Sequence, residues 1–204
     1  MPKWSEAQEW ESSWWGKCLN TYGEEEKQIL YAKRMGLHFY HNKKSPYNID
    51  MKGKDVIDIG GGPTSLLLKC ENLGVAVVAD PLVVPEWVHH RYGAAAIDFW
   101  QTPGEQLRGD DGLLGFFDEA WIYNCLQHTA NPKRIIDNAL GMAKLVRIFE
   151  WTNTRINEGH PHSFTKTLLD KWLGGDGKEE TLKGQANCYG TCYYGIFVGK
   201  RLDS

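Results

Sequence analysis

The chain has 204 residues, of which 42% are hydrophobic and 24% are charged, with a formal net charge of −3 and an isoelectric point near 6.2. This composition is typical of a globular domain and lacks the excess of Lys and Arg found in proteins that bind the nucleic-acid backbone. The sequence contains no run of about 18 apolar residues, the length needed to span a membrane. Acidic residues lie among the first fifteen residues, so we expect neither a membrane span nor a secretory signal. The five scattered cysteines indicate reduced thiols, and we expect a cytoplasmic protein.

The first fifty residues differ from the rest of the chain because they carry helical patterns only. Trp10, Trp14 and Cys18 recur at the spacing of one helix face. Two helices are expected before a polar, turn-rich stretch, over residues 5–22 and 24–37. We therefore expect a helical cap or lid over residues 1–50 and a main domain over residues 51–204.

In the main domain, short apolar runs alternate with helical patterns. The expected strands cover residues 55–59, 75–80, 94–99, 116–124 and 145–151. The expected helices between and after them cover residues 66–73, 85–92, 133–144 and 164–173. Two further strands, 181–185 and 192–201, follow without a helix between them. This order predicts an α/β fold with a Rossmann-like, doubly wound and mostly parallel sheet that carries an antiparallel C-terminal strand.

Three consecutive glycines, Gly60, Gly61 and Gly62, end the first core strand. Without a Cβ atom they permit a sharp turn and let a ligand approach the backbone. Asp80 ends the second strand, 20 positions after Gly60, where a carboxylate can bind a ribose diol. The glycines alone are also compatible with a plain tight turn. Together with the acid they indicate a nucleoside-cofactor site, which leaves NAD and S-adenosylmethionine open.

The stretch VIDIGGGPTS (56–65) resembles the first motif of class I S-adenosylmethionine-dependent methyltransferases, in which an acid precedes the glycines. Asp58 has that place, whereas a dinucleotide fingerprint would need glycine instead of Ser65 and would avoid an acid beside a pyrophosphate. AIDFW (96–100) and FDEAWIYNCLQHTANP (117–132) resemble the motifs of the third and fourth strands. Thr64 departs from the third glycine that many members have.

The resemblance implies S-adenosyl-L-methionine as the cofactor, with S-adenosyl-L-homocysteine as the product. It also implies a small-molecule acceptor, such as a sugar or another metabolite, methylated on oxygen or nitrogen. The cofactor-binding residues that it implies are Asp58, Gly60, Gly61, Gly62, Thr64, Asp80, Pro81, Asp98, Phe99, Asn124 and Leu126.

His128 ends the fourth-strand motif, and we expect it to be the catalytic base; a purely structural histidine is the alternative. Acceptor contacts are expected from Trp14, Trp15, Tyr22, His160 and His162, although the aromatic residues could equally anchor the first helix. His160 and His162 form an HxH pair that could bind a metal, but no Asp or Glu follows at a supporting spacing, so no metal site is expected.

Three other functions remain open at this point. They are a dehydrogenase, a non-catalytic S-adenosylmethionine-binding protein and a nucleic-acid methyltransferase. The last is disfavoured because the fourth strand ends in NCLQ rather than in an Asn/Asp-Pro-Pro-aromatic motif, and because a Pro-Cys motif is missing. We expect no membrane partner and a monomer or homodimer.

Overall fold

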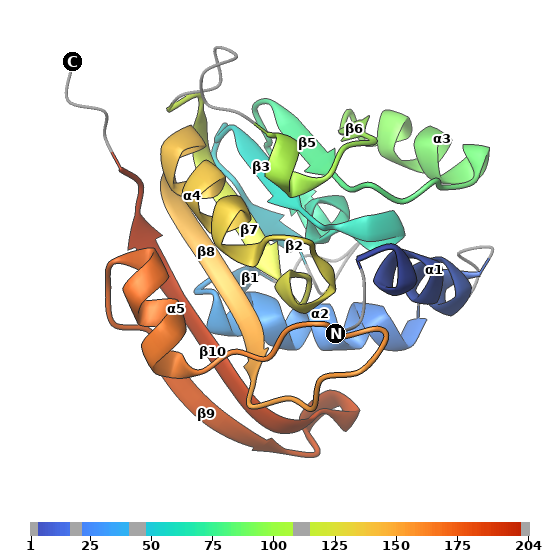
Figure 1. Cartoon of the computed structure of the whole chain (residues 1–204). Helices are drawn as coiled ribbons and strands as arrows, with labels where there is room; N and C mark the ends of the chain where they lie inside the picture. The colour runs from blue at the N-terminus through green and yellow to red at the C-terminus, as the bar shows by residue number, and fades with distance from the viewer. Residues whose placement is uncertain (1–3, 17–21, 41–47, 108–114, 201–204) are drawn as a thin grey trace.

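A seven-stranded sheet forms the centre of the computed structural model, which describes residues 4–16, 22–40, 48–107 and 115–200 (Figure 1). The strand order is β6-β5-β3-β7-β8-β10-β9. The strands are β3 (Val56–Ile59), β5 (Ala76–Ala79), β6 (Asp98–Trp100), β7 (Phe117–Tyr123), β8 (Ala143–Thr152), β9 (Lys178–Lys183) and β10 (Tyr189–Val198). Neighbouring strands run parallel except where β10 pairs with β8 and β9. The expected fold class is thereby confirmed.

A smaller sheet connects the N-terminal part of the chain to this core. It consists of β1 (Phe39–Tyr40), β2 (Asn48–Asp50) and β4 (Cys70–Glu71), in the order β1-β2-β4. β2 pairs with β4 in parallel, Ile49 opposite Cys70, so backbone hydrogen bonds bridge the expected domain boundary at residue 50.

Both faces of the sheet are covered at β3 and β5, which explains why these two strands are buried throughout. Adjacent residues of β3 belong to different cores: Val56 packs with Trp121 and Phe149, and Ile57 packs with Ile122. The helices are α1 (Trp4–Trp15), α2 (Tyr22–Arg34), α3 (Glu86–Ala94), α4 (Pro132–Met142) and α5 (Lys166–Leu173). In Figure 1, α1 and α2 lie together near the lower edge of the sheet, where the parallel strands end.

The ends of α4 and α5 follow from local sequence. The side chain of Asn131 accepts the backbone N–H of Arg134, and Pro132 takes the first helical position, where no N–H is needed. Thr165 caps α5 in the same way. Gly174 ends α5 in the left-handed conformation, with φ of 71°.

The helix expected over residues 66–73 is wrong. Two short 3₁₀ turns, Gly62–Thr64 and Leu66–Lys69, lead directly into β4. Two tyrosine hydroxyls take the N–H groups that begin this segment: Ser65 donates to Tyr92 at 2.9 Å and Leu66 donates to Tyr123 at 3.0 Å. The Tyr92 hydroxyl in turn donates to the Gly62 carbonyl at 2.6 Å. Distant side chains therefore determine the backbone here, and local helix propensity does not.

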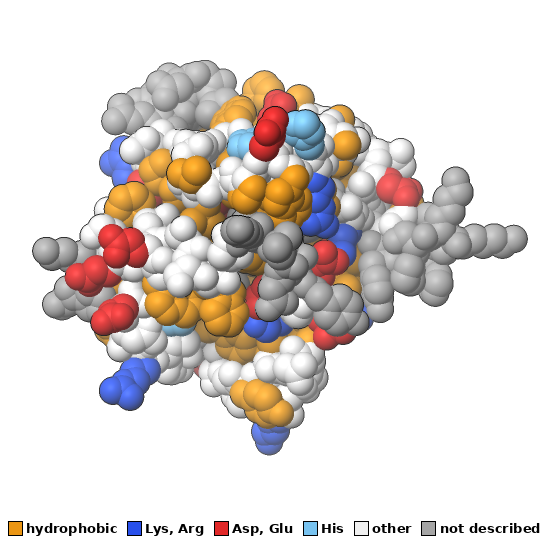
Figure 2. Space-filling view, turned by 90° about the vertical axis from the view of Figure 1, so that its right-hand side faces the viewer, with side chains coloured by type: hydrophobic (Ala, Val, Ile, Leu, Met, Phe, Trp, Pro, Cys, Tyr) orange, Lys and Arg blue, Asp and Glu red, His pale blue; other side chains and the backbone are white. Residues whose placement is uncertain are grey.

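Figure 2 shows the face at the right of Figure 1, where Lys and Arg side chains of the described residues lie among acidic and apolar ones and form no long stripe. Within the described ranges, no helix combines the length and apolar character needed to cross a membrane.

Replacing Tyr92 by Phe tests the importance of the tyrosine anchors. The change leaves the buried Ser65 N–H and Gly62 carbonyl without a partner, so we expect a loss of roughly 1–3 kcal/mol in the free energy of unfolding. Urea denaturation measures this loss. Tyr194→Phe is the matched control, because that half-buried hydroxyl makes one long contact of 3.4 Å with Glu180. Equal effects of the two changes would contradict the anchoring role.

Candidate ligand-binding site

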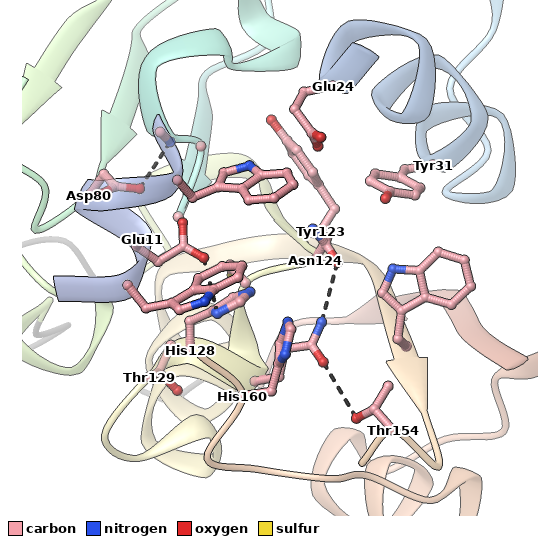
Figure 3. A pocket seen from close by; sticks show the side chains of 18 of the residues that line it. Glu11, Glu24, Tyr31, Asp80, Tyr123, Asn124, His128, Thr129, Thr154 and His160 are labelled. Carbon is pink, nitrogen blue, oxygen red and sulfur yellow. Dashed lines mark hydrogen bonds and ion pairs between the residues drawn. The ribbon is translucent and has the colours of Figure 1, made fainter. Parts of the chain in front are cut away.

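A cavity of about 800 Å³ opens at the carboxyl ends of β3, β5, β7 and β8. This volume is within the range of pockets that bind small molecules and cofactors. Residues of α1 and α2 form one side of the cavity, and the segments after the four strands form the rest (Figure 3). Ligands of open α/β sheets bind at this edge, where the strand order reverses.

The three glycines of the turn differ in what surrounds them. A Cβ atom on Gly60 would lie 2.6 Å from the Cβ atom of Cys125, and one on Gly61 would lie 2.6 Å from Oδ2 of Asp58. At Gly62 the nearest atom would be 3.8 Å away, on Trp15. Gly60 and Gly61 are therefore needed for close packing, whereas Gly62 leaves room on the side of the cavity.

Asp58 lies beneath the turn, fully buried, and is not part of the cavity wall. Its Oδ2 atom accepts the hydroxyls of Ser65 and Tyr123, each at 2.5 Å, and its Oδ1 atom has no donor. Burial raises the pKa of Asp58 to about 7. The carboxyl group thus holds the turn from below and keeps one oxygen free for a further interaction.

Asp80 forms part of the cavity wall. It accepts the backbone N–H of Gly62 on Oδ2 and that of Leu82 on Oδ1, both at 2.9 Å (Figure 3). Burial raises its pKa to about 6, against the effect of these two hydrogen bonds. Each oxygen of an ionised carboxylate can accept a second hydrogen bond, so Asp80 can still bind a donor in the cavity.

The turn offers few N–H groups to an anion. Several donate to acceptors within the protein, and Pro63 has no N–H; the donors are Gly60, Gly62, Ser65, Leu66, Leu67 and Leu68. With two carboxyl groups directly below, the turn is unfavourable for a phosphate.

His128, in the 3₁₀ turn Leu126–His128 after β7, lines the cavity. Its Nδ1 atom lies 2.6 Å from the Gly159 carbonyl oxygen and 3.0 Å from Oε1 of Glu11. A carbonyl oxygen only accepts, so the hydrogen is on Nδ1 and, in the neutral ring, Nε2 is an acceptor. Burial lowers the pKa of His128 to about 4 and raises that of Glu11 to about 7. Between these values both groups are uncharged.

Two further histidines lie in the segment after β8. His160 lines the cavity, 4.6 Å from His128 between ring centres, and burial lowers its pKa to about 4. His162 lies outside the cavity wall, where its Nε2 atom contacts the Thr129 carbonyl oxygen at 2.8 Å. The first can meet a ligand, whereas the second connects two loops.

Aromatic rings from α1, α2 and β8 form much of the cavity wall. Trp10 and Trp14 of α1 stack with their ring centres 5.4 Å apart, and Trp15 donates its indole N–H to Glu11 at 3.1 Å. Tyr31 of α2 lies 6.4 Å from Trp151 of β8, ring edge to ring face. Flat or cationic groups are the ligands that such walls bind well.

The structure brings together many of the residues expected from the sequence. Those that line the cavity are Trp14, Trp15, Gly60, Gly61, Gly62, Asp80, Pro81, Asn124, His128 and His160. Those outside its wall are Asp58, Thr64, Asp98, Phe99, Leu126 and His162. The side chain of Tyr22 lies outside the described residues.

Packing explains three of the residues outside the wall. The hydroxyl of Thr64 accepts the side-chain amide of Gln28 at 3.1 Å, and Leu126 is buried in the core with α4. Phe99 stacks on Tyr92, with the ring centres 5.6 Å apart. Asp98 is exposed. The segment after β6 reaches the cavity instead at Pro103, Gly104 and Glu105.

Glu11, which contacts the expected base, was not among the residues expected from the sequence. A signal for it exists in the helical pattern, since Trp4, Gln8, Glu11 and Trp15 share one face of α1 and all line the cavity. Among the described residues, no cluster of three His, Cys, Asp or Glu could hold a metal ion.

No family model and no curated protein sequence matches the chain. Solved structures do. A methyltransferase from Thermotoga maritima, described as S-adenosylmethionine-dependent and a possible histamine N-methyltransferase, has a TM-score of 0.61 at 10% identity, over 97% of this chain and 99% of that one. The N-methyltransferase NodS from Bradyrhizobium japonicum, in complex with S-adenosyl-L-homocysteine, has a TM-score of 0.55 at 13% identity, over 86% of each chain.

In two further matches, a smaller share of the other protein's chain is covered. The [4+2]-cyclase SpnF has a TM-score of 0.56 at 16% identity, over 79% of this chain and 61% of that one. The chain spans about half, 52%, of an O-methyltransferase family protein from Burkholderia thailandensis, at 15% identity, 72% coverage of this chain and a TM-score of 0.50. With its strand order and antiparallel β10, the chain has the fold of the class I S-adenosylmethionine-dependent methyltransferases.

Proposed function

We propose that the protein is an enzyme that binds S-adenosyl-L-methionine in this cavity and methylates a small molecule. One observation carries the proposal: two buried carboxyl groups, Asp58 and Asp80, flank a glycine turn whose N–H groups are largely occupied. The cofactor carries an ammonium group, ribose hydroxyls and a sulfonium, which are donors or cations. NAD carries two phosphates, which this turn disfavours.

The residues present fit the cofactor. Asp80 is placed for the ribose hydroxyls, and Gly62 leaves space beside it. The Oδ1 atom of Asp58 is buried without a donor beneath the turn, and its charge favours an ammonium group above the turn, contacted through water. Pro81 and Gly104 provide apolar wall for the adenine. When bound, the cofactor supplies a methyl group on an electrophilic sulfonium.

The chain's own residues then orient the acceptor and take its proton. Methyl transfer needs the acceptor lone pair in line with the breaking bond, so positioning supplies much of the acceleration. We assign the base to His128, because the Gly159 carbonyl orients its ring and burial keeps Nε2 unprotonated. Residues 1–50 act as the cap, since α1 and α2 supply one side of the cavity.

Fold alone does not give methyl transfer, since SpnF shares it and is a cyclase. Two neighbours described as N-methyltransferases, from Thermotoga maritima and Bradyrhizobium japonicum, support transfer to a small molecule, as does the size of the cavity. The net charge of −3 disfavours nucleic acid as the acceptor.

Isothermal titration calorimetry tests cofactor identity. We expect S-adenosyl-L-homocysteine to bind and NAD not to bind. Asp80→Ala should weaken binding by roughly 1.5–3 kcal/mol, the range for hydrogen bonds to a charged group. Asp98→Ala is the matched control, because Asp98 is exposed outside the cavity wall, and it should bind like the parent. Binding of NAD alone would reject the proposal.

The second prediction concerns pH and Asp58. Its pKa is raised to about 7 in the folded protein, so its contribution to the free energy of unfolding is present below about pH 4 and is lost as pH rises through 7. Asp58→Asn should remove that loss, about 1.4 kcal/mol per pH unit for one proton, between pH 5 and 6.5. Denaturant titrations at several pH values measure it. The variant retains the contributions of Glu11, Asp80 and Glu150, whose pKa values burial also raises.

An Asp58→Asn variant that keeps the parent's full pH dependence would contradict this assignment. The affinity for S-adenosyl-L-homocysteine provides a second readout. In the parent it should rise with pH through 7, as the carboxylate forms beside the ammonium of the ligand, and in the variant it should not.

The third prediction separates catalysis from binding at His128. With isotopically labelled cofactor and a mixed panel of small amines and alcohols, His128→Ala should lose about 10²–10⁴-fold in methyl transfer. Its affinity for S-adenosyl-L-homocysteine should stay unchanged. The parent rate should show no histidine step near pH 6.5, because the pKa of His128 is about 4. His162→Ala, outside the cavity wall, is the control, and parent-like turnover of His128→Ala would leave His128 a structural residue.

A further inference from the structure

The acceptor side of the cavity is rich in hydrogen-bond acceptors and poor in available cations. The charged residues of the whole cavity wall are Glu11, Glu24, Asp80, Glu105, Lys27 and Arg155, of which Asp80 and Glu105 lie on the side proposed for the cofactor. Lys27 is paired with Glu24 at 2.6 Å, and Arg155 is an exposed residue. His128 and His160 are uncharged near neutral pH because burial lowers both pKa values to about 4. A carboxylate or phosphate on the acceptor would therefore meet the acidic groups Glu11 and Glu24, with Lys27 already paired and Arg155 turned to solvent.

One wall group is an acceptor that lacks a donor. Gln28 is 6% exposed and lines the cavity; its Nε2 atom donates to Thr64, which leaves Oε1 buried without a partner. Glu24 precedes Gln28 by four residues and lines the cavity from the same helix face. Its Oε1 atom pairs with Lys27, and its second carboxylate oxygen can accept a hydrogen bond from a ligand. A buried acceptor without a donor is costly, so a ligand that donates a hydrogen bond here recovers that cost.

Glu11 approaches from the other side. Figure 3 shows Glu11 and His128 on one side of the cavity, with Glu24 and Tyr31 on the other. The Glu11 carboxyl group receives the indole N–H of Trp15 and contacts Nδ1 of His128, which uses two of about four acceptor positions. The remaining positions are available to a ligand, and a bound ammonium ion favours the ionised form of the carboxyl group. Between the two acids the wall is aromatic, through Trp14, Tyr31 and Trp151.

We propose that the methyl acceptor is an amine on an aromatic or other flat apolar group, held as its ammonium ion between Glu11 of α1 and the Glu24–Gln28 face of α2. This inference rests on the proposed function, whose acceptor it specifies. Carboxylates, an amide oxygen and ring faces are the groups that bind an organic ammonium. A neutral alcohol could donate a hydrogen bond to these acceptors, but it would lack the charge–charge attraction to the carboxylates.

The acceptor's proton passes to His128, the base assigned above. An ammonium nitrogen has no lone pair, so one proton passes from it to Nε2 of His128 before reaction. The nitrogen then forms the N–C bond with the methyl group as the C–S bond breaks, its electron pair remaining on sulfur, and the product is a methylammonium ion. The Glu11 carboxyl group, whose Oε1 atom lies 3.0 Å from Nδ1 of His128, holds the ammonium ion and stabilises the protonated imidazole.

The test compares three probes of one shape: phenethylamine, 2-phenylethanol and 3-phenylpropionate. Protein saturated with S-adenosyl-L-homocysteine is titrated with each, and binding is followed by calorimetry and by the fluorescence of the cavity tryptophans. We expect the amine to bind at least about tenfold more tightly than the alcohol, and the carboxylate to bind most weakly.

Glu11→Gln keeps the shape of the side chain and removes its charge, so it should abolish most of the preference for the amine. Glu9→Gln is the matched control, an identical change at an exposed position of the same helix, and it should keep the preference. Glu24→Gln provides an independent second variant and should reduce the preference as well. Unchanged affinity for S-adenosyl-L-homocysteine shows that each variant is folded.

Equal binding of amine and alcohol, binding of none of the probes, or a preference that survives both Glu11→Gln and Glu24→Gln would overturn the inference. The same titrations in the absence of S-adenosyl-L-homocysteine separate a failure of this inference from a failure of the proposed function. If the parent prefers the amine but binds no S-adenosyl-L-homocysteine, the ammonium site stands and the cofactor assignment fails.

Discussion

The burial of Asp58 beneath the glycine turn is the constraint on which the site depends. A carboxyl group removed from water must be hydrogen-bonded, and two hydroxyls from distant parts of the chain, of Ser65 and Tyr123, meet that need. The same arrangement requires glycine at position 61, where any Cβ atom would collide with Oδ2. The turn then presents the Gly62 N–H to Asp80, so the second carboxylate is placed by the first. The buried carboxyl group of Asp58 thus determines both the shape of the glycine turn and the position of the second carboxyl group.

The sheet and the N-terminal helices contribute different chemical groups to the cavity wall. The strand ends supply the oxygens and the glycine backbone, which suit a nucleoside with a cationic tail. The helices supply ring faces, Glu11 and the Glu24–Gln28 face. Contact between Glu11 and His128 connects the two parts at the point where chemistry would occur. The N-terminal helices and the strand ends therefore line one and the same cavity.

Much of the fold could be predicted from the sequence, because its determinants are local. The continuously apolar strands, Asn131 as a cap and Gly174 as a helix end each depend on residues within a few positions. The helix expected after the glycine turn failed because Tyr92 and Tyr123, 27 and 57 positions away from their partners, determine that backbone. Gly62, Asp80 and His128 were expected from motif and strand position, and all three line the cavity. Asp98 and Phe99 were expected in the cofactor site because their stretch resembles the family's third-strand motif. In the structure the segment after β6 lines the cavity only from Pro103 onward, after the strand has ended.

The position of β10 has a consequence for the synthesis of the protein. β10 follows β9 in sequence but lies between β8 and β9 in the sheet, and it is the ladder partner of both. β9 therefore cannot join the sheet until β10 has left the ribosome. The cavity wall includes Tyr189, Gly190 and Thr191, at the beginning of β10. A nascent chain can thus form the glycine turn early while its acceptor side is still open, and ligand binding becomes complete only when the last strand inserts.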